Sequence, residues 1–291
     1  MKKYFEMKET LFLDRDVFEM DFIPEIFRFR EAQVTKIVSA LQSGLQGNSP
    51  VNLVIRGPPG SGKTTAVNRI FSEIGASHEG IIPVYINFHV EESKFGVFAR
   101  IFEELHIQKS VPKGQTIGPL IDLIGKTISQ REAVLVACFD NADHHLPNHL
   151  IDDILSSFLG ISKKYPKAKV GFLLMTSDME VNLRLALDSC FTSDLKPDKI
   201  NFPLYQKKHM REILHDRIQA GLHPGVIPPG MLSFLVSHIE PAGDVRAGIH
   251  LVKWSVLAAE RAGRSSVTEA DIMVSTGVPG YLRAIRPRCE S

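Results

Sequence analysis

The sequence is poor in cysteine and has no excess of either charge. Its 291 residues include three cysteines, Cys138, Cys190 and Cys289, which are too few for a disulfide framework and lack the paired spacing of a zinc site. Lysine and arginine total 34 and aspartate and glutamate 33, so the net charge of +1 argues against a protein that coats nucleic acid through bulk charge. Scarce cysteine is typical of a reducing compartment, and we expect a cytoplasmic protein.

Long hydrophobic runs are also missing. No stretch reaches the roughly 18 consecutive apolar residues of a membrane span, so we expect no membrane partner. Residues 1–16 scatter charges where a signal peptide would have an apolar segment. A chain of this length has room for one large domain or two modest ones.

The first two thirds of the chain alternate apolar, β-branched runs with segments of helical periodicity. This alternation predicts an α/β fold, in which helices flank a parallel sheet. The predicted strands are 51–57, 81–90, 133–142 and 169–178, and the predicted helices are 34–45, 64–74, 93–105, 117–130 and 150–165.

After Phe202 the pattern predicts helices alone, at 206–222, 228–240, 243–263 and 268–276. We therefore predict a base domain over 1–202, which includes an irregular arm over 1–33, and an all-helical domain over 203–276. Residues 277–291 form a basic tail with three arginines, Arg283, Arg286 and Arg288, and we expect this tail to be poorly ordered.

The strongest motif is GPPGSGKT at residues 57–64, which matches the phosphate-loop pattern and lies between a predicted strand and a predicted helix. Its glycines let backbone N–H groups face a phosphate, and the helix start adds its positive dipole end. We expect Lys63 to reach the β- and γ-phosphates of ATP and Thr64 to place its hydroxyl on Mg²⁺. The predicted nucleotide-binding residues here are Gly57, Pro58, Pro59, Gly60, Ser61, Gly62, Lys63, Thr64 and Thr65.

A carboxylate for the metal comes from Asp140, at the end of the strand over 133–142, so Thr64 and Asp140 are the predicted metal residues. The next residue is Asn141, where many such enzymes carry a glutamate that polarises water. Asparagine orients a water but takes no proton, and Asp143 is an alternative base if its loop bends. We therefore expect tight ATP binding and slow hydrolysis.

Five segments together resemble the archaeal origin-recognition and replication-initiator family of AAA+ ATPases, relatives of the eukaryotic origin recognition complex and its helicase-loading partner. They are DFIPEIFRFREAQ (21–33), GPPGSGKTT (57–65), FPLYQKKHMREILHDRI (202–218), LHPGVIP (222–228) and GDVR (243–246), and the likeness spans about residues 11–276. The resemblance implies an AAA+ P-loop base with a helical lid that bind ATP or ADP with Mg²⁺.

The resemblance also implies roles for residues outside the phosphate loop. Ile23, Pro24 and Arg30 would lie by the adenine, and Arg246 would be the lid arginine that touches the γ-phosphate. The alternatives are that Arg30 is a plain helix-start arginine and that Arg246 is a solvated arginine paired with a nearby acid.

Departures from the family pattern concern hydrolysis. Asn141 replaces a glutamate, Ser177 replaces the usual sensor asparagine, and the expected arginine finger falls on Cys190, with Arg184 six residues earlier. An arginine finger is worth about 10³–10⁵ in rate in related enzymes. These departures favour a nucleotide-binding switch, so enzymatic turnover stays an open question, with Asn141, Ser177 and Arg246 as the candidate catalytic residues.

DNA contact is a separate question. Family members usually carry a winged-helix domain after the lid, and the fifteen residues beyond Thr276 are too few for one. Lys109 and Lys113, in the loop over 106–116, lie where the family carries a DNA-contacting insertion, although an ordinary surface loop is equally compatible. We give little weight to a zinc site at His144, His145 and His149.

Two functions follow. The first is an ATP-binding, origin-recognition-type replication initiator with weak or absent hydrolysis, which contacts double-stranded DNA through its base domain and meets a paralogous initiator or the replicative helicase. The alternative is a regulatory AAA+ module that binds ATP, does not bind DNA, and acts through a paralogous initiator or another protein partner. A generic remodelling ATPase would instead show a robust hexamer and fast turnover.

Overall fold

The computed structural model describes residues 10–46, 48, 50–77, 80–108, 110–145, 149–179 and 197–278. The chain divides into two compact units. The α/β unit comprises Arg30–Pro58 and Gly62–Phe202. The helical unit comprises the residues up to Phe29, Pro59–Ser61 and the residues from Pro203. No helix of the described ranges is long and apolar enough to cross a membrane.

The α/β unit is built on a five-stranded parallel sheet in the order β2-β3-β4-β1-β5. The strands are β1 (Leu53–Arg56), β2 (Ile81–Asn87), β3 (Val134–Asp140), β4 (Lys169–Thr176) and β5 (Asp198–Asn201). Every residue of β3 is buried, as expected for a strand inside a parallel sheet. Because Asn87 pairs with Asp140, the carboxyl ends of β2 and β3 lie side by side.

Strand β5 was absent from our predictions. It is four residues long, lies at the edge of the sheet next to β1, and buries only Ile200. Such a short strand carries no periodic signal that distinguishes it from a loop. The other four strands and the α/β class are as the sequence predicts.

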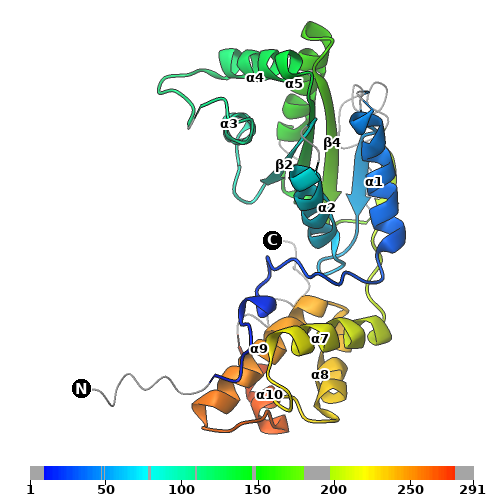
Figure 1. Ribbon diagram of the computed structural model, residues 1–291, viewed down its shortest axis with the longest axis vertical. Coiled ribbons are helices and arrows are strands. Elements are labelled where there is room, and N and C mark those ends of the chain that lie inside the picture. Colours follow the sequence, from blue (N-terminus) through cyan, green and yellow to red (C-terminus); the bar gives the residue numbers. More distant parts are fainter. Residues whose placement is uncertain are drawn as a thin grey trace, which may run out of the picture. The chain divides into compact units, whose positions relative to one another are not determined.

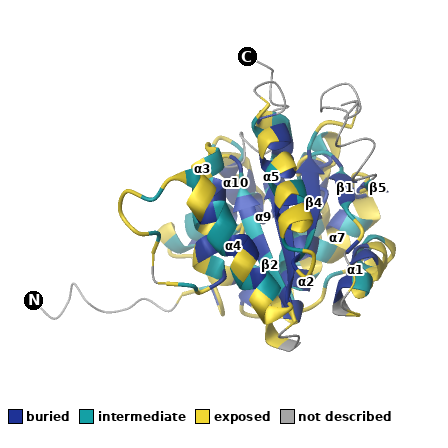
Figure 2. Cartoon of the chain, turned by 90° about the horizontal axis from the view of Figure 1, so that it is seen from above, coloured by how far each residue is buried: buried dark blue, intermediate teal, exposed yellow. Residues whose placement is uncertain are grey.

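In the described ranges, the helices that flank the sheet are α1 (Glu31–Leu45), α2 (Lys63–Ser77), α3 (Lys94–Glu104), α4 (Ile117–Arg131) and α5 (Leu150–Lys164). Helices α3, α4 and α5 lie together on one side of the sheet (Figure 1). They contact one another and bury a large apolar cluster against the sheet. Its largest side chains include Phe88, Phe98, Phe102 and Phe139. In Figure 2 the buried residues follow the strands, while the outer faces of the helices are exposed.

The helical unit contains α7 (Lys207–Gly221), α8 (Met231–Ile239), α9 (Val245–Arg261) and α10 (Glu269–Ser275), with 3-10 turns at Asp16–Phe18 and Glu240–Ala242. Helix α9 contacts the other three helices. At Gly248 of α9 an added Cβ would lie 2.7 Å from Ile239 and 2.8 Å from Leu214, so glycine lets these helices cross closely.

The described part of the arm packs with the helical unit. Phe12, Val17 and Phe18 are buried in its apolar cluster, and the N–H of Leu13 donates to the carbonyl of Gly221 at 2.9 Å. The sequence predicts the arm as part of the base domain, whereas its described residues up to Phe29 pack with the helical unit. The physical reason is burial, because the arm's aromatic residues cover the apolar face of α7 and α9. The other domain limits stay predictions.

Candidate nucleotide-binding site

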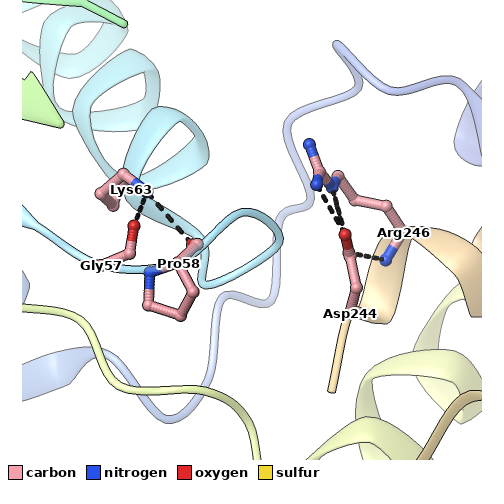
Figure 3. Close-up of polar contacts among 5 residues, drawn as sticks. All are labelled: Gly57, Pro58, Lys63, Asp244 and Arg246. Atoms are coloured by element: carbon pink, nitrogen blue, oxygen red, sulfur yellow. Dashed lines mark hydrogen bonds and ion pairs between the residues drawn. The ribbon is translucent and has the colours of Figure 1, made fainter. Parts of the chain in front are cut away.

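The phosphate-loop motif forms a loop between β1 and α2. Gly60 and Gly62 have φ values of +75° and +89°, which favour glycine because a side chain would strain the backbone there. Lys63 is buried, and its ammonium donates to the carbonyl oxygens of Gly57 and Pro58, the latter at 3.1 Å (Figure 3). The loop therefore curls around the lysine head group. Among the other predicted loop residues, Ser61 is buried, whereas Pro59 and Thr64 are exposed and Thr65 is half-buried.

The two predicted metal residues meet. The Thr64 hydroxyl, in the first turn of α2, donates to Oδ2 of Asp140, at the end of β3, at 2.8 Å. The Tyr85 hydroxyl donates to the same Oδ2 at 2.6 Å, and the Asn141 N–H donates to Oδ1 at 2.8 Å. Asp140 itself is 6% exposed, so these donors compensate for the water that its carboxylate loses on folding.

Tyr85 and Asn87 were not among the predicted site residues, although both lie on β2 beside Asp140. Burial raises the pKa of Tyr85 well above its usual value, and the negative charge of Asp140 raises it further. Tyr85 is thus a hydrogen-bond donor at neutral pH. Burial likewise raises the pKa of Cys138, so its thiol is protonated. Tyr85 lies on the strand predicted over 81–90, but the pairing of that strand with the Asp140 strand is known only from the structure.

Asn141 is held by its backbone and its side chain. Its φ of +58° lies in the left-handed region, which asparagine tolerates better than most residues. Its side-chain nitrogen donates to Oδ1 of Asn87 at 3.0 Å, and that oxygen also accepts the N–H of His89 at 3.0 Å. The amide therefore points toward β2.

Ser177 follows β4 and lies, like Asn141, at the carboxyl ends of the strands. Its N–H donates to Oδ1 of Asp143 at 3.2 Å, which joins the loop after β4 to the loop after β3. Asp143, the alternative base, is thereby linked to the residue that follows β4. The position of the expected arginine finger, Cys190, and the nearby Arg184 lie outside the described residues, as do Lys109 and the tail arginines.

Arg246 lies in the first turn of α9 in the helical unit. Asp244 caps this helix by accepting the N–H of Arg246 at 2.9 Å, and its carboxylate also binds the guanidinium through Nε at 3.0 Å and through a terminal nitrogen at 2.6 Å (Figure 3). The arginine is thus paired with a nearby acid, and Asp244 is buried while Arg246 is 43% exposed at its side chain.

The residues proposed for adenine lie in both units. Ile23 is exposed and Pro24 half-buried in the arm, which belongs to the helical unit. Arg30 starts α1 of the α/β unit, is 3% exposed, and places its guanidinium 5.7 Å from the centre of the Phe202 ring.

The histidines after β3 make local contacts. His145 is buried and its ring nitrogen lies 3.2 Å from the carbonyl of Phe88, while His149 lies 3.3 Å from Asp152. Within the described part of the chain, no group of three or more histidine, cysteine or acidic side chains has the arrangement of a metal site.

The fold and the loop define a P-loop ATPase of the AAA+ class with a helical lid. The family model for the AAA domain matches residues 48–185, and that for the Cdc6 AAA+ ATPase-type lid domain matches residues 211–276. ORC1-type DNA replication protein 6 of Halobacterium salinarum is 33% identical over 264 residues, which are 91% of this chain and 70% of the relative. ORC1-type DNA replication protein 2 of Methanosarcina mazei is 32% identical over the same shares. The chain belongs to the archaeal ORC1-type DNA replication protein family.

Solved structures show the same fold. The Aeropyrum pernix ORC1 protein in complex with DNA is similar with a TM-score of 0.79 and 22% identity, over 92% of this chain and 70% of that one. The Aeropyrum pernix ORC2 protein in its ADPNP-ADP complexes is similar with a TM-score of 0.77 and 21% identity, over 91% of this chain and 71% of that one. The predicted AAA+ base and helical lid, and the predicted family, are confirmed.

Proposed function

We propose that this replication protein is an ATP-binding switch with weak or absent hydrolysis. The observation that carries the proposal is the joint geometry of the loop and the sheet edge, where a buried Lys63 lies inside the glycine-rich loop and Thr64 contacts Asp140. The donor set fits a nucleotide with Mg²⁺, because an ammonium suits phosphate oxygens and hydroxyl and carboxylate oxygens suit this metal. When bound, Mg²⁺ would neutralise charge on the β- and γ-phosphates.

Weak hydrolysis is proposed from Asn141 and Arg246. The Asn141 amide accepts no proton and already donates to Asn87. Arg246, proposed to touch the γ-phosphate, is paired with Asp244, which occupies part of its hydrogen-bonding capacity. Ser177 offers a short hydroxyl where a longer amide is usual in the family. Ile23, Pro24 and Arg30 are the proposed adenine contacts.

The test is nucleotide content and turnover of the purified protein beside Asn141→Glu and Lys63→Ala. We expect bound ATP or ADP, no turnover at several per second, a faster Asn141→Glu, and no nucleotide on Lys63→Ala. A matched Asn141→Gln variant controls for side-chain length and for the left-handed backbone at this position. Fast turnover by the unmodified protein without a partner contradicts the switch, and Lys63→Ala that binds ATP as well as the wild type contradicts the site.

We further propose that the α/β unit contacts double-stranded DNA through the loop over 106–116, where Lys113 is exposed. The support is that the Aeropyrum pernix ORC1 protein was solved in complex with DNA. Binding to duplex at two salt concentrations tests this, because phosphate contacts make affinity fall steeply with salt. Lys113→Gln should lower the slope of log affinity against log salt by about 1, and Lys167→Gln, on a lysine paired with Glu132, should not.

Absence of duplex binding even at about 50 mM salt, a concentration at which phosphate contacts are strong, contradicts DNA contact. That result supports the regulatory module, which acts through a paralogous initiator or another protein partner.

A further inference from the structure

The Asp140 carboxylate, at the carboxyl end of β3, accepts three hydrogen bonds from the protein. Its Oδ2 accepts from Thr64 at 2.8 Å and from Tyr85 at 2.6 Å. Within the described residues, its Oδ1 accepts from the Asn141 N–H alone, at 2.8 Å. A carboxylate oxygen has about two acceptor positions. Oδ2 is therefore filled by protein donors, whereas Oδ1 keeps one position for a further donor such as a metal-bound water.

We propose that Tyr85 is a positioning residue that fixes the plane of the Asp140 carboxylate, so that Oδ1 faces the Mg²⁺ of a bound nucleotide. This inference rests on the proposed function, because it assigns a task to a residue of the same site. Thr64 of the phosphate loop donates to the same oxygen, and Tyr85 adds a second donor from the neighbouring strand.

Three donors are needed because of how aspartate rotates. The last torsion of an aspartate side chain has a broad, roughly two-fold profile, so one backbone and one hydroxyl contact leave the carboxylate plane loosely held. The Tyr85 ring extends from β2, which is hydrogen-bonded to β3 along its whole length. Its phenol therefore approaches from a rigid support, and a hydroxyl that donates to a carboxylate at 2.6 Å is a charge-assisted hydrogen bond.

The same geometry assists Thr64. Its hydroxyl donates its one proton to Asp140, which leaves its oxygen lone pairs available to a metal. If the carboxylate turns, the hydroxyl hydrogen of Thr64 must follow it or lose this acceptor, which changes where the oxygen lone pairs point. Tyr85 therefore acts on both predicted metal residues through one oxygen atom.

The experiment compares Tyr85→Phe with Tyr165→Phe. Tyr165 is a matched control, because its hydroxyl also donates to a carboxylate, Oδ1 of Asp122, at 2.7 Å, and Asp122 lies on α4, away from the site residues. The dissociation constant of ATP is measured by calorimetry in excess Mg²⁺ and again in EDTA. The ratio of the two constants is the Mg²⁺ enhancement.

We expect Tyr85→Phe to lower the Mg²⁺ enhancement about 10-fold, the lower end of the effect of removing a group that orients a metal ligand. The affinity in EDTA should stay within about two-fold, and Tyr165→Phe should resemble the wild type in both conditions. An unchanged enhancement in Tyr85→Phe overturns the inference. An equal loss of affinity with and without Mg²⁺ also overturns it, because that is the result of a purely structural role.

A double-mutant cycle tests whether Tyr85 acts through Asp140. In an Asp140→Asn background, Tyr85→Phe should change the Mg²⁺ enhancement no further, and additive effects overturn the inference. Failure of the proposed function looks different. In that case the wild-type protein binds ATP in neither condition, whereas failure of this inference alone leaves wild-type binding and its enhancement intact.

Discussion

Replacing Arg217 with methionine should destabilise the helical unit. Arg217 lies on α7, is 8% exposed, and joins the arm to that helix. Its guanidinium donates to the carbonyls of Val17 at 2.6 Å and Phe22 at 3.3 Å, and it lies 4.6 Å from the centre of the Phe22 ring. Methionine keeps much of the apolar stem but removes every donor.

Opposing terms set the size of this effect. Burial lowers the pKa of Arg217 to about 10, and at about 1.4 kcal/mol per pKa unit burying the charge costs roughly 3 kcal/mol. Two hydrogen bonds from a charged donor contribute about 1.5–3 kcal/mol each, and the ring contact adds about 1 kcal/mol. Methionine removes both the cost of burying the charge and the gain from the hydrogen bonds and the ring contact. It also leaves the buried Val17 carbonyl without its donor. We therefore expect a loss of about 2–3 kcal/mol.

Urea unfolding followed by fluorescence is the appropriate assay, because the one tryptophan of the chain, Trp254, lies on α9 in the helical unit. With a typical slope of about 2 kcal/mol per molar urea, the midpoint should fall by roughly 1 M. Arg211→Met is the control, since Arg211 is an exposed residue of the same helix whose guanidinium binds Ser233. If both variants unfold at the wild-type midpoint, the guanidinium does not anchor the arm.

Other predictions concern backbone packing and pH. Gly221→Ala should lower the free energy of unfolding by about 1–3 kcal/mol, because its Cβ would lie 2.4 Å from the Phe18 ring. Gly160→Ala, whose Cβ would have no atom within 4 Å, should raise it by about 0.5–1 kcal/mol. Shifts of the melting temperature in the same direction for both variants contradict this. Burial, and then the charge of Lys253, lower the pKa of His250 below 6.5. The unfolded chain then binds the proton more readily, so the histidine's contribution is present above about pH 6.5 and is lost as pH falls toward the folded pKa. His250→Gln should reduce the change in the free energy of unfolding with pH, as followed by tryptophan fluorescence. An unchanged pH dependence refutes the assignment.

Much of the fold was accessible from the sequence because its signals are local. Strand β3 reads as an uninterrupted apolar run, and the glycines of the loop are required by local φ values. The packing of the arm is not accessible from the sequence, because nothing in residues 10–29 specifies which surface their aromatic side chains cover. Phe12 and Phe18 are buried by helices about 200 residues away in sequence, a contact that periodicity cannot detect.

The residues of the candidate site also separate into those predicted by local motifs and those placed by long-range pairing. Lys63, Thr64 and Asp140 follow from motifs whose spacing is set by a strand, a tight turn and a helix. Tyr85 and Asn87 reach the site through the register of β2 on β3, which pairs Asn87 with Asp140 and is not specified by either strand alone. Once that register is known, Tyr85 is an evident neighbour, because alternate residues of a strand share one face.

The proposed nucleotide contacts share a further property. Lys63 binds two carbonyls of its own loop, Asn141 binds Asn87, and Arg246 binds Asp244. An ammonium has three N–H donors and a guanidinium five, so a bond to phosphate need not displace the protein partner of Lys63 or Arg246. Where a phosphate does replace one of these partners, the net gain is the difference between the two hydrogen bonds, which is far smaller than the gross strength of either. A buried carboxylate such as that of Asp244 would then need a new donor. Such a replacement would link the internal contacts of the protein to the nucleotide that it binds. The proposed switch requires such a link.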